Sequence, residues 1–155
     1  MSLGGVVVVH RSIVDAHVML VRDGRVLLSR RRGSYGDGMW HLPSGKLEAG
    51  ESLLENAIRE AWEEIGVRVD AADLRHVHTL HAVAPGVEPR LGVFFEVLAW
   101  GGEPENLEPE KCYELAWFRL DELPADIIAY PAAGLHAYRE GRPFGVLGWP
   151  QRPSG

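Results

Sequence analysis

The sequence predicts an α+β domain in which helices pack on a mixed β-sheet. Three observations lead to this expectation. A β-hairpin pattern opens the chain, one strong helix pattern occupies residues 53–65, and further strand patterns follow without regular strand–helix alternation. Strands on both sides of a central helix, with hairpins among them, favour a mixed sheet covered by helices.

The hairpin is expected between two strands, at residues 13–21 and 26–28. Both segments are apolar and rich in β-formers, and Asp23 and Gly24 lie between them. An Asp-Gly pair flanked by apolar runs is a strong local signal for a two-residue hairpin turn.

Two loops are expected after the hairpin. Residues 31–40 carry three glycines and an aspartate, which favour irregular backbone. In residues 41–51, Pro43, Gly45 and Gly50 interrupt both the helical and the strand period, so this segment also predicts a loop.

A helix is expected at about residues 53–65. Ser52 followed three residues later by Glu55 forms a capping box, and Gly66 is a natural C-terminal stop. At about 100° per residue, six apolar side chains share one broad face, which we expect to pack on the core. They are Leu54, Ala57, Ile58, Ala61, Trp62 and Ile65.

Three glutamates, Glu60, Glu63 and Glu64, fall on an adjoining arc of this helix roughly 100° wide. We expect them to point together, away from the core.

Beyond the helix, strand patterns cover residues 74–83 and 91–100.

A short strand is expected at residues 116–120 and a C-terminal helix at 131–140, with Pro131 in its first turn. At 155 residues the chain has the length of one domain, which we expect to span residues 1–155 with a core at about 12–140. No internal repeat or linker interrupts it.

Composition narrows the classes of function. The chain is 46% apolar and 25% charged, which is ordinary for a globular protein. Its net charge of −6 argues against sequence-independent nucleic-acid binding, because such binding neutralises many phosphates. An anionic substrate would therefore need a bridging cation.

Cys112 is the only cysteine, so no intramolecular disulfide can form, and a reducing cytoplasm is the expected compartment. The apolar run at residues 4–9 is short and lacks a basic leader, so it fits neither a signal peptide nor a membrane span. We expect a cytoplasmic protein that binds neither nucleic acid nor a membrane.

The strongest motif begins at Gly45, continues with Glu51 six residues later and ends with "REAWEEIGV" at residues 59–67. This pattern resembles the signature box of the Nudix hydrolases. The hairpin, the later strands and "WFRLDELP" at residues 117–124 also resemble that family, so the likeness extends over most of the chain. It implies a Nudix-type α/β/α sandwich with a mixed β-sheet.

Elementary chemistry supports a metal site at this motif. Mg²⁺ prefers oxygen ligands and is commonly held by a few carboxylates, water and substrate phosphates. Glu60 and Glu64 lie one helical turn apart, with Glu63 beside them. The alternative is a solvated acidic face, since an exposed like-charge pair costs only about 0.2–0.5 kcal/mol. The spacing from Gly45 and Glu51 favours the metal site.

The resemblance adds detail to this site. It implies that the Gly45 carbonyl is a further metal ligand, that Mn²⁺ can substitute for Mg²⁺, and that Glu51 pairs with Arg59 in a structural role. It also implies attack of a metal-activated water on a diphosphate, with a glutamate as proton acceptor. Glu60 is the first choice for that base and Glu63 the second.

A second stretch, "ENLEPEKCYELAWFRLDELP", is similar to the corresponding loop and strand of MutT-type nucleoside triphosphate diphosphatases. In those enzymes a glutamate of the "EPEK" segment reaches back to the metal. Glu110 is the best match, and Glu108 is the alternate. An ordinary acidic surface loop is the competing explanation.

Candidate substrate-binding residues are less specific. Arg30 and Arg32 would share a side of their strand, because strand side chains alternate between faces. Trp40 could stack on a nucleobase, although a core position is at least as compatible with the sequence. For His76, His78 and His81, strand alternation separates His81 from the other two and no cysteine joins them, which favours structural or solvent-facing roles over zinc binding.

Taken together, these features predict a Mg²⁺-dependent Nudix hydrolase that converts nucleoside triphosphates, including modified or oxidised ones, to monophosphate and pyrophosphate. Two alternatives stay open: an ADP-ribose or nucleotide-sugar pyrophosphatase, and a non-catalytic nucleotide-sensing module. The expected partner is a small-molecule nucleotide, and a homodimer is compatible with the resemblance.

Overall fold

The strand β1 (Ile13–Arg22) organises the fold. In the computed structural model, which describes residues 5–85 and 87–150, it lies inside the sheet between β2 (Arg25–Arg31) and β6 (Val87–Val97). The turn from β1 to β2 places both Asp23 and Gly24 at positive φ, 54° and 73°, as a type I′ turn requires. The predicted hairpin is confirmed.

The strands form one mixed sheet in the order β3-β2-β1-β6-β5-β8, with β4 paired to β1 and β7 paired to β2. The pairs β1·β6 and β5·β8 are parallel and the other ladders are antiparallel. The predicted mixed sheet is therefore confirmed. The remaining strands are β3 (Trp40–His41), β4 (Ser44–Lys46), β5 (Leu74–Ala84), β7 (Cys112–Arg119) and β8 (Phe144–Leu147).

Helix α1 (Leu53–Ile65) has the predicted bounds. The Ser52 hydroxyl accepts a hydrogen bond from the Glu55 backbone N–H at 3.1 Å, and this bond caps the first turn. At the other end Gly66 adopts φ 69°, and its N–H donates to the Trp62 carbonyl at 3.1 Å.

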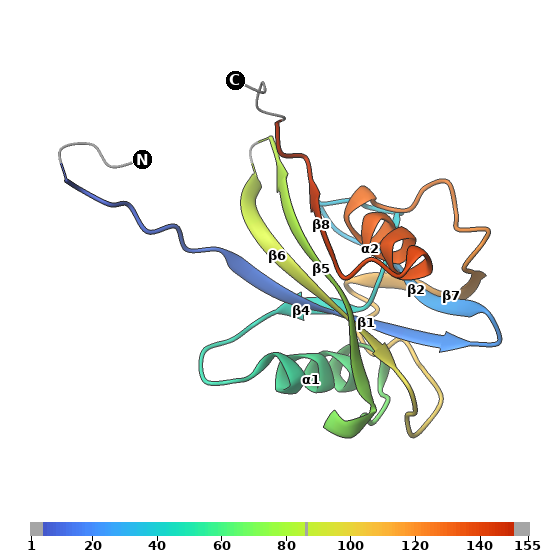
Figure 1. Ribbon diagram of the computed structural model, residues 1–155. Coiled ribbons are helices and arrows are strands. Elements are labelled where there is room, and N and C mark those ends of the chain that lie inside the picture. Colours follow the sequence, from blue (N-terminus) through green and yellow to red (C-terminus); the bar gives the residue numbers. More distant parts are fainter. Residues whose placement is uncertain (1–4, 86, 151–155) are drawn as a thin grey trace.

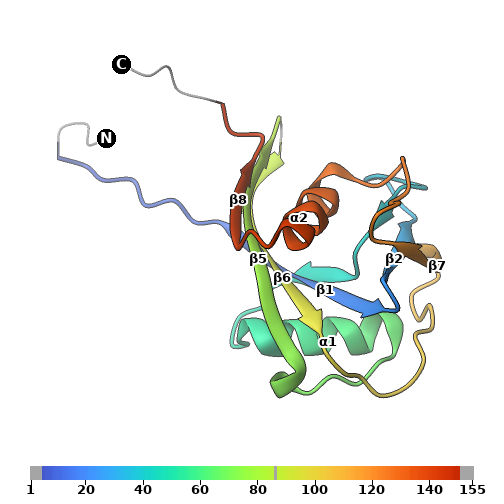
Figure 2. The same cartoon turned by 45° about the vertical axis from the view of Figure 1, so that its right-hand side comes forward.

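Helix α2 (Ala129–Glu140) begins two residues earlier than expected and holds Pro131 in its first turn. Figures 1 and 2 show α1 on one face of the sheet and α2 on the other. A short 3₁₀ turn, η1 (Ala71–Asp73), leads into β5. The arrangement is the expected α/β/α sandwich. No helix in residues 5–85 and 87–150 is long and apolar enough to cross a membrane.

Two hydrophobic cores fill the space between the layers. Strand β1 contributes side chains to both cores, because successive residues of a strand point to opposite faces of the sheet. Ala16, Val18 and Leu20 belong to the core beneath α1, whereas Met19 belongs to the core beneath α2 with Leu135.

The predicted orientation of α1 was wrong in part. Leu54 and Trp62, expected in the core, are 39% and 53% exposed, whereas Glu60 is only 8% exposed. The small residues Ala57 and Ala61 let the helix lie close to the sheet, and its buried face is centred on them. The acidic arc therefore does not point away from the protein, since Glu60 faces inward.

Short strands were also missed. Residues 41–51 were expected to be loop, but β4 pairs there with β1, and β8 was not predicted at all. Strand β7 begins at Cys112, four residues before the expected 116. Segments of two to four residues are too short to show a strand period in the sequence. Their pairing also depends on a partner strand that is distant in sequence.

Candidate active site

Gly45 and Glu60 meet where β4 packs on α1. A β-carbon added to Gly45 would overlap the carboxylate of Glu60, so any larger residue would force that side chain to shift. Gly45 has no positive φ, and its role is therefore close approach rather than an unusual backbone conformation. This contact explains the glycine of the motif in physical terms.

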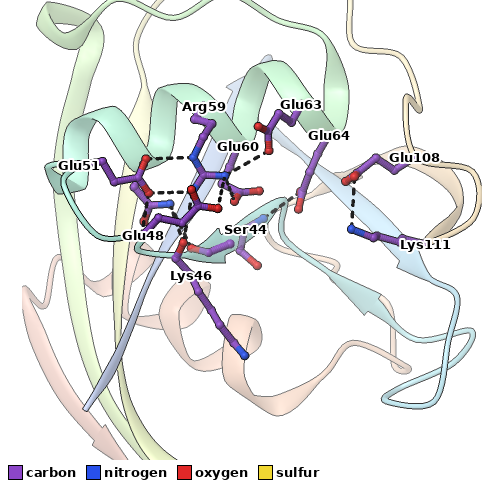
Figure 3. A network of polar contacts seen from close by, with 12 residues as sticks. Ser44, Lys46, Glu48, Glu51, Arg59, Glu60, Glu63, Glu64, Glu108 and Lys111 are labelled. Atoms are coloured by element: carbon purple, nitrogen blue, oxygen red, sulfur yellow. Dashed lines mark hydrogen bonds and ion pairs between the residues drawn. The ribbon is translucent and has the colours of Figure 1, made fainter. Parts of the chain in front are cut away.

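Arg59 is the hub of the acidic cluster (Figure 3). Its Nε and Nη2 donate to the two Glu51 carboxylate oxygens at 2.9 and 2.7 Å, which confirms the predicted pair. Its Nη1 donates to Glu60 Oε1 at 2.8 Å and to Glu63 Oε2 at 3.1 Å. The bidentate bond from Arg59 lowers the pKa of Glu51 to about 2, with help from the Glu48 backbone N–H.

Asn56 fixes β4 to the helix. Its side chain is fully buried, and its Nδ2 donates to the carbonyls of Gly45 at 3.3 Å and Lys46 at 3.4 Å. Arg59 Nη2 also donates to the Lys46 carbonyl, at 3.2 Å. The sequence analysis missed Asn56, and only its place on the arc beside Glu60 could have indicated this role.

Glu60, which is buried, and Glu64, which is half-buried, form an acid pair. The two carboxylates lie close enough that each alters the pKa of the other. Burial raises the pKa of Glu60, although Arg59 opposes the shift. The pKa of Glu64 lies well above its usual value because of burial and then the charges of Glu60 and Glu108; a 3.1 Å bond from the Ser44 N–H opposes this shift.

A narrow cleft of about 140 Å³ opens beside Glu64, between β2, the C-terminal end of α1 and the loop before β7. Its charged lining is split by sign: Glu64 and Glu108 are acidic, whereas Arg31, Arg32 and Lys111 are basic. Figure 3 shows the Glu64 and Glu108 side chains approaching the same space, with Lys111 paired to Glu108 at 3.5 Å.

The acidic cluster is not closed around a cation site in this arrangement. Within residues 5–85 and 87–150, no three or more His, Cys, Asp or Glu side chains are already gathered as an ion site. Glu63 is turned to Arg59, and Glu64 is turned to Ser44. The donors nevertheless fit a hard cation, because they are all oxygens and because the Glu60 and Glu64 carboxylates are held close together.

The structure places the two candidate glutamates of the loop, Glu108 and Glu110, differently from the order of preference that the sequence suggested. Glu110, the first choice from the sequence, is exposed and does not line the cleft, whereas Glu108 does. Arg32 lines the cleft and donates to the Pro109 carbonyl at 3.3 Å. Arg30 does not line the cleft. Its Nη2 instead lies 3.3 Å from Glu114 Oε2.

The guanidinium groups of Arg30 and Arg32 both lie against the ring of Tyr113, at 4.9 and 5.4 Å from its centroid, although strand alternation does not explain this because Arg32 follows the last residue of β2. Trp40 does not face the cleft. It is 8% exposed and packs edge-on against Phe118 at 4.7 Å in the core beneath α2, so its ring is unavailable for stacking on a base.

The three histidines of β5 do not gather. His78 is buried and bonds to the Arg142 carbonyl at 2.7 Å, whereas His76 bonds to Thr79 at 2.8 Å. His81 lies against Trp149 with ring centroids 4.6 Å apart. These contacts agree with structural roles.

A second polar cluster, on the α2 face, was not anticipated. Asp15 Oδ1 accepts from Tyr130 at 2.9 Å and lies 2.7 Å from His17 Nε2, and Arg90 Nη1 approaches Asp15 Oδ2 at 3.3 Å. Burial opposes ionisation of Asp15, but the bonds from His17 and Tyr130 and the charge of Arg90 lower its pKa overall. Burial and the neighbouring His17 lower the pKa of His41, beside this cluster, to about 3.

The fold and the glutamate-bearing helix together define the class. An α/β/α sandwich carries "REAWEEIGV" on α1, packed on a glycine of β4. The model of the NUDIX domain family matches residues 10–137, and the chain belongs to that family.

Its relatives include hydrolases of two kinds. The oxidized purine nucleoside triphosphate hydrolase of Danio rerio is 31% identical over 111 residues, which are 69% of this chain and 66% of that protein. The NAD-capped RNA hydrolase NudC of Chromobacterium violaceum is 36% identical over 112 residues, 72% of this chain and 40% of that protein. The chain thus spans less than two thirds of the length of either relative.

Among solved structures, the chain is similar to the MutT NUDIX hydrolase from Burkholderia pseudomallei. The TM-score is 0.76 at 28% identity, and the match covers 83% of this chain and 98% of that one. The predicted Nudix fold and the MutT-like resemblance are confirmed.

Proposed function

We propose that this protein is a Mg²⁺-dependent Nudix hydrolase that cleaves the diphosphate linkage of nucleoside triphosphates, including modified or oxidised ones, to monophosphate and pyrophosphate. The cleft carries the proposal, because it combines Glu64 and Glu108 with Arg31, Arg32 and Lys111. Acidic groups suit a metal and basic groups suit phosphate oxygens, so the two sets together fit a metal-bound polyphosphate. The similarity to the oxidized purine nucleoside triphosphate hydrolase of Danio rerio supports the same choice.

Glu60 and Glu64 are the proposed metal carboxylates, with the Gly45 carbonyl as a backbone ligand. Glu108 is the preferred ligand from the loop, and Glu110 is the alternate, because only Glu108 lines the cleft beside Glu64. Mn²⁺ is expected to replace Mg²⁺, since both accept oxygen ligands. When bound, the cation supplies an activated water and neutralises charge on the phosphate oxygens.

Glu63 is the preferred proton acceptor. Its side chain is 52% exposed, so water can reach it although Arg59 donates to it at 3.1 Å, whereas the Glu60 side chain is only 11% exposed. A general base must approach the water that it deprotonates. This order reverses the preference for Glu60 that the sequence suggested.

The phosphate groups are proposed to bind Arg31, Arg32 and Lys111. Arg31 shares the cleft side of β2 with Ser29, and its Nε donates to the Tyr35 carbonyl at 2.9 Å, which orients the guanidinium. Arg30 was a sequence candidate for this role, but its contact with Glu114 leaves it outside the cleft.

The test is a panel of nucleoside triphosphates, oxidised nucleoside triphosphates, ADP-ribose, nucleotide sugars and NAD, each incubated with Mg²⁺, with Mn²⁺ and with excess chelator. We expect monophosphate and pyrophosphate from the triphosphates and no turnover with chelator. Absence of cleavage of every diphosphate in the panel would exclude the proposed activity.

A pyrophosphatase for ADP-ribose or nucleotide sugars is the second candidate. The match to the NAD-capped RNA hydrolase favours it, because NAD also contains a diphosphate between two nucleosides. Two nucleoside or sugar phosphates, with no free pyrophosphate, would be the products that identify this activity.

A nucleotide-sensing module without catalysis is the third candidate. Glu63→Gln and Glu64→Gln separate it from an enzyme, because a sensor would keep its function in both variants. In an enzyme, both variants would retain nucleotide binding but lose turnover.

We further propose that the chain forms a single domain, that it acts in the cytoplasm and that it does not bind nucleic acid.

A further inference from the structure

The loop before β7 carries Glu108, and its first part is tied to the C-terminal end of α1. The Leu107 N–H donates to the Glu64 carbonyl at 3.1 Å, and the Glu105 N–H donates to the Ile65 carbonyl at 2.9 Å. The last carbonyls of a helix have no partner within the helix, so the loop supplies the donors that they lack. The loop is therefore anchored to the helical turn that carries Glu64.

Beyond this anchor, the side chain of Asn106 closes the loop. Its Nδ2 donates to the carbonyl of Cys112, the first residue of β7, at 2.7 Å, and its Oδ1 accepts the Glu108 N–H at 3.2 Å. Both bonds are partly buried. An asparagine side chain commonly accepts the N–H two residues further on, which favours a turn of the backbone. One amide group thus joins the start of β7 to the backbone of Glu108.

Both backbone groups of Glu108 are engaged in this loop. Its N–H donates to Asn106, and its carbonyl accepts from the N–H groups of Lys111 at 2.8 Å and Cys112 at 2.9 Å. These bonds fix the peptide units on both sides of the Glu108 Cα, and with them the direction in which the side chain leaves the loop. The side chain is 26% exposed and approaches the space beside Glu64 (Figure 3).

Glu110 is an internal comparison. It lies two residues further along the same loop, but it is exposed and does not line the cleft. Membership of an acidic loop therefore does not by itself place a carboxylate beside Glu64. In the part of the chain that the structure describes, Asn106 bonds to the backbone of Glu108 and not to that of Glu110.

We propose that Asn106 is a positioning residue of the candidate metal site, which holds Glu108 opposite Glu64 so that both carboxylates can reach one cation. The inference rests on the proposed function, because it takes Glu108 as the loop ligand. The Asn106 oxygen and nitrogen are both engaged within the loop, so the residue acts through Glu108. A ligand that is held in place before the cation arrives loses less conformational freedom on binding.

The first test is a double-mutant cycle, measured by calorimetric titration of the full chain with Mn²⁺. We expect Asn106→Ala to weaken binding by about 10-fold in the unaltered chain, as the loss of a residue that supports a ligand commonly does. When Glu108→Gln is already present, the same change should alter binding by less than about twofold. The matched control is a Glu110→Gln background, in which Asn106→Ala should again cost about 10-fold.

A role limited to general stability would weaken Mn²⁺ binding equally in all three backgrounds, and that result would overturn the proposal. Glu108→Gln without any effect on binding would refute the loop ligand and its positioning residue together. Nucleotide cleavage is measured separately with the substrate panel. Failure of the proposed function therefore shows as absent hydrolysis, whereas failure of this inference shows as equal losses in an active chain.

The second test measures the bond between Asn106 and Glu108. Hydrogen exchange of the Glu108 amide in the metal-free chain, followed by NMR, should be at least about threefold faster in Asn106→Ala. Asn106→Asp should keep slow exchange, because its carboxylate can accept the same N–H. Unchanged circular dichroism shows that each variant folds. Equal exchange rates in the unaltered chain and both variants would contradict the proposed role of Asn106.

Discussion

The carboxylate of Glu60 occupies the space that a β-carbon on Gly45 would need. Glycine at this position therefore determines where an acid of the proposed metal site can lie, although the two residues are fifteen positions apart. Lys46 and Ser44, on either side of Gly45, belong to the same short strand, β4, and hold the backbone in place against β1.

Gly45→Ala is expected to displace Glu60 and to lower both metal affinity and kcat/KM by about 10–100-fold, because positioning errors near a metal have effects of that size. Calorimetric titration with Mn²⁺ measures the first quantity and steady-state kinetics the second. The control is Gly101→Ala, where the added carbon meets only the flexible Arg68 side chain. Equal metal affinity in the two variants would contradict the role assigned to Gly45.

Asn56→Ala is expected to destabilise the protein by about 1–3 kcal/mol, because two carbonyls of β4 lose a buried donor. Urea unfolding at neutral pH measures this loss. Asn56→Asp keeps the shape of the side chain and removes the donor, so it should be at least as unstable. Full stability in the Asp variant would show that the bonds to Gly45 and Lys46 contribute nothing.

Glu108 and Glu110 offer a matched pair, because they lie two residues apart in one loop but only Glu108 lines the cleft. Glu108→Gln is expected to weaken Mn²⁺ binding by about 10–100-fold, and Glu110→Gln should leave it within about twofold. The same titration distinguishes them. The reverse pattern would restore Glu110 as the loop ligand.

Local signals allowed the sequence to predict some elements accurately. Helix α1 has the expected bounds because Ser52 and Gly66 act within one turn of its ends. The first hairpin was predictable for the same reason, since Asp23 and Gly24 determine the turn. In both cases the residues that decide the structure are neighbours in the chain.

Long-range packing explains what the sequence could not predict. The rotation of α1, which buries Glu60 and exposes Trp62, depends on how closely Ala57 and Ala61 approach the sheet. The choice of Glu108 over Glu110 depends on the conformation of a loop that bonds through Asn106 to the Cys112 carbonyl. No local pattern encodes either arrangement.

Tyr130→Phe and Asp15→Asn test the buried cluster on the α2 face. Tyr130 donates to the charged Asp15, so Tyr130→Phe should cost about 1.5–3 kcal/mol of unfolding free energy at pH 7. The folded pKa of Asp15 lies below its usual value of 3.8, so its ionised form stabilises the fold above that pH. This stabilisation is lost as the pH falls through the folded pKa. Urea midpoints of the unaltered chain should therefore drop below pH 4 by more than those of Asp15→Asn. Parallel profiles for the two proteins would show that Asp15 is not stabilised as an anion in the fold.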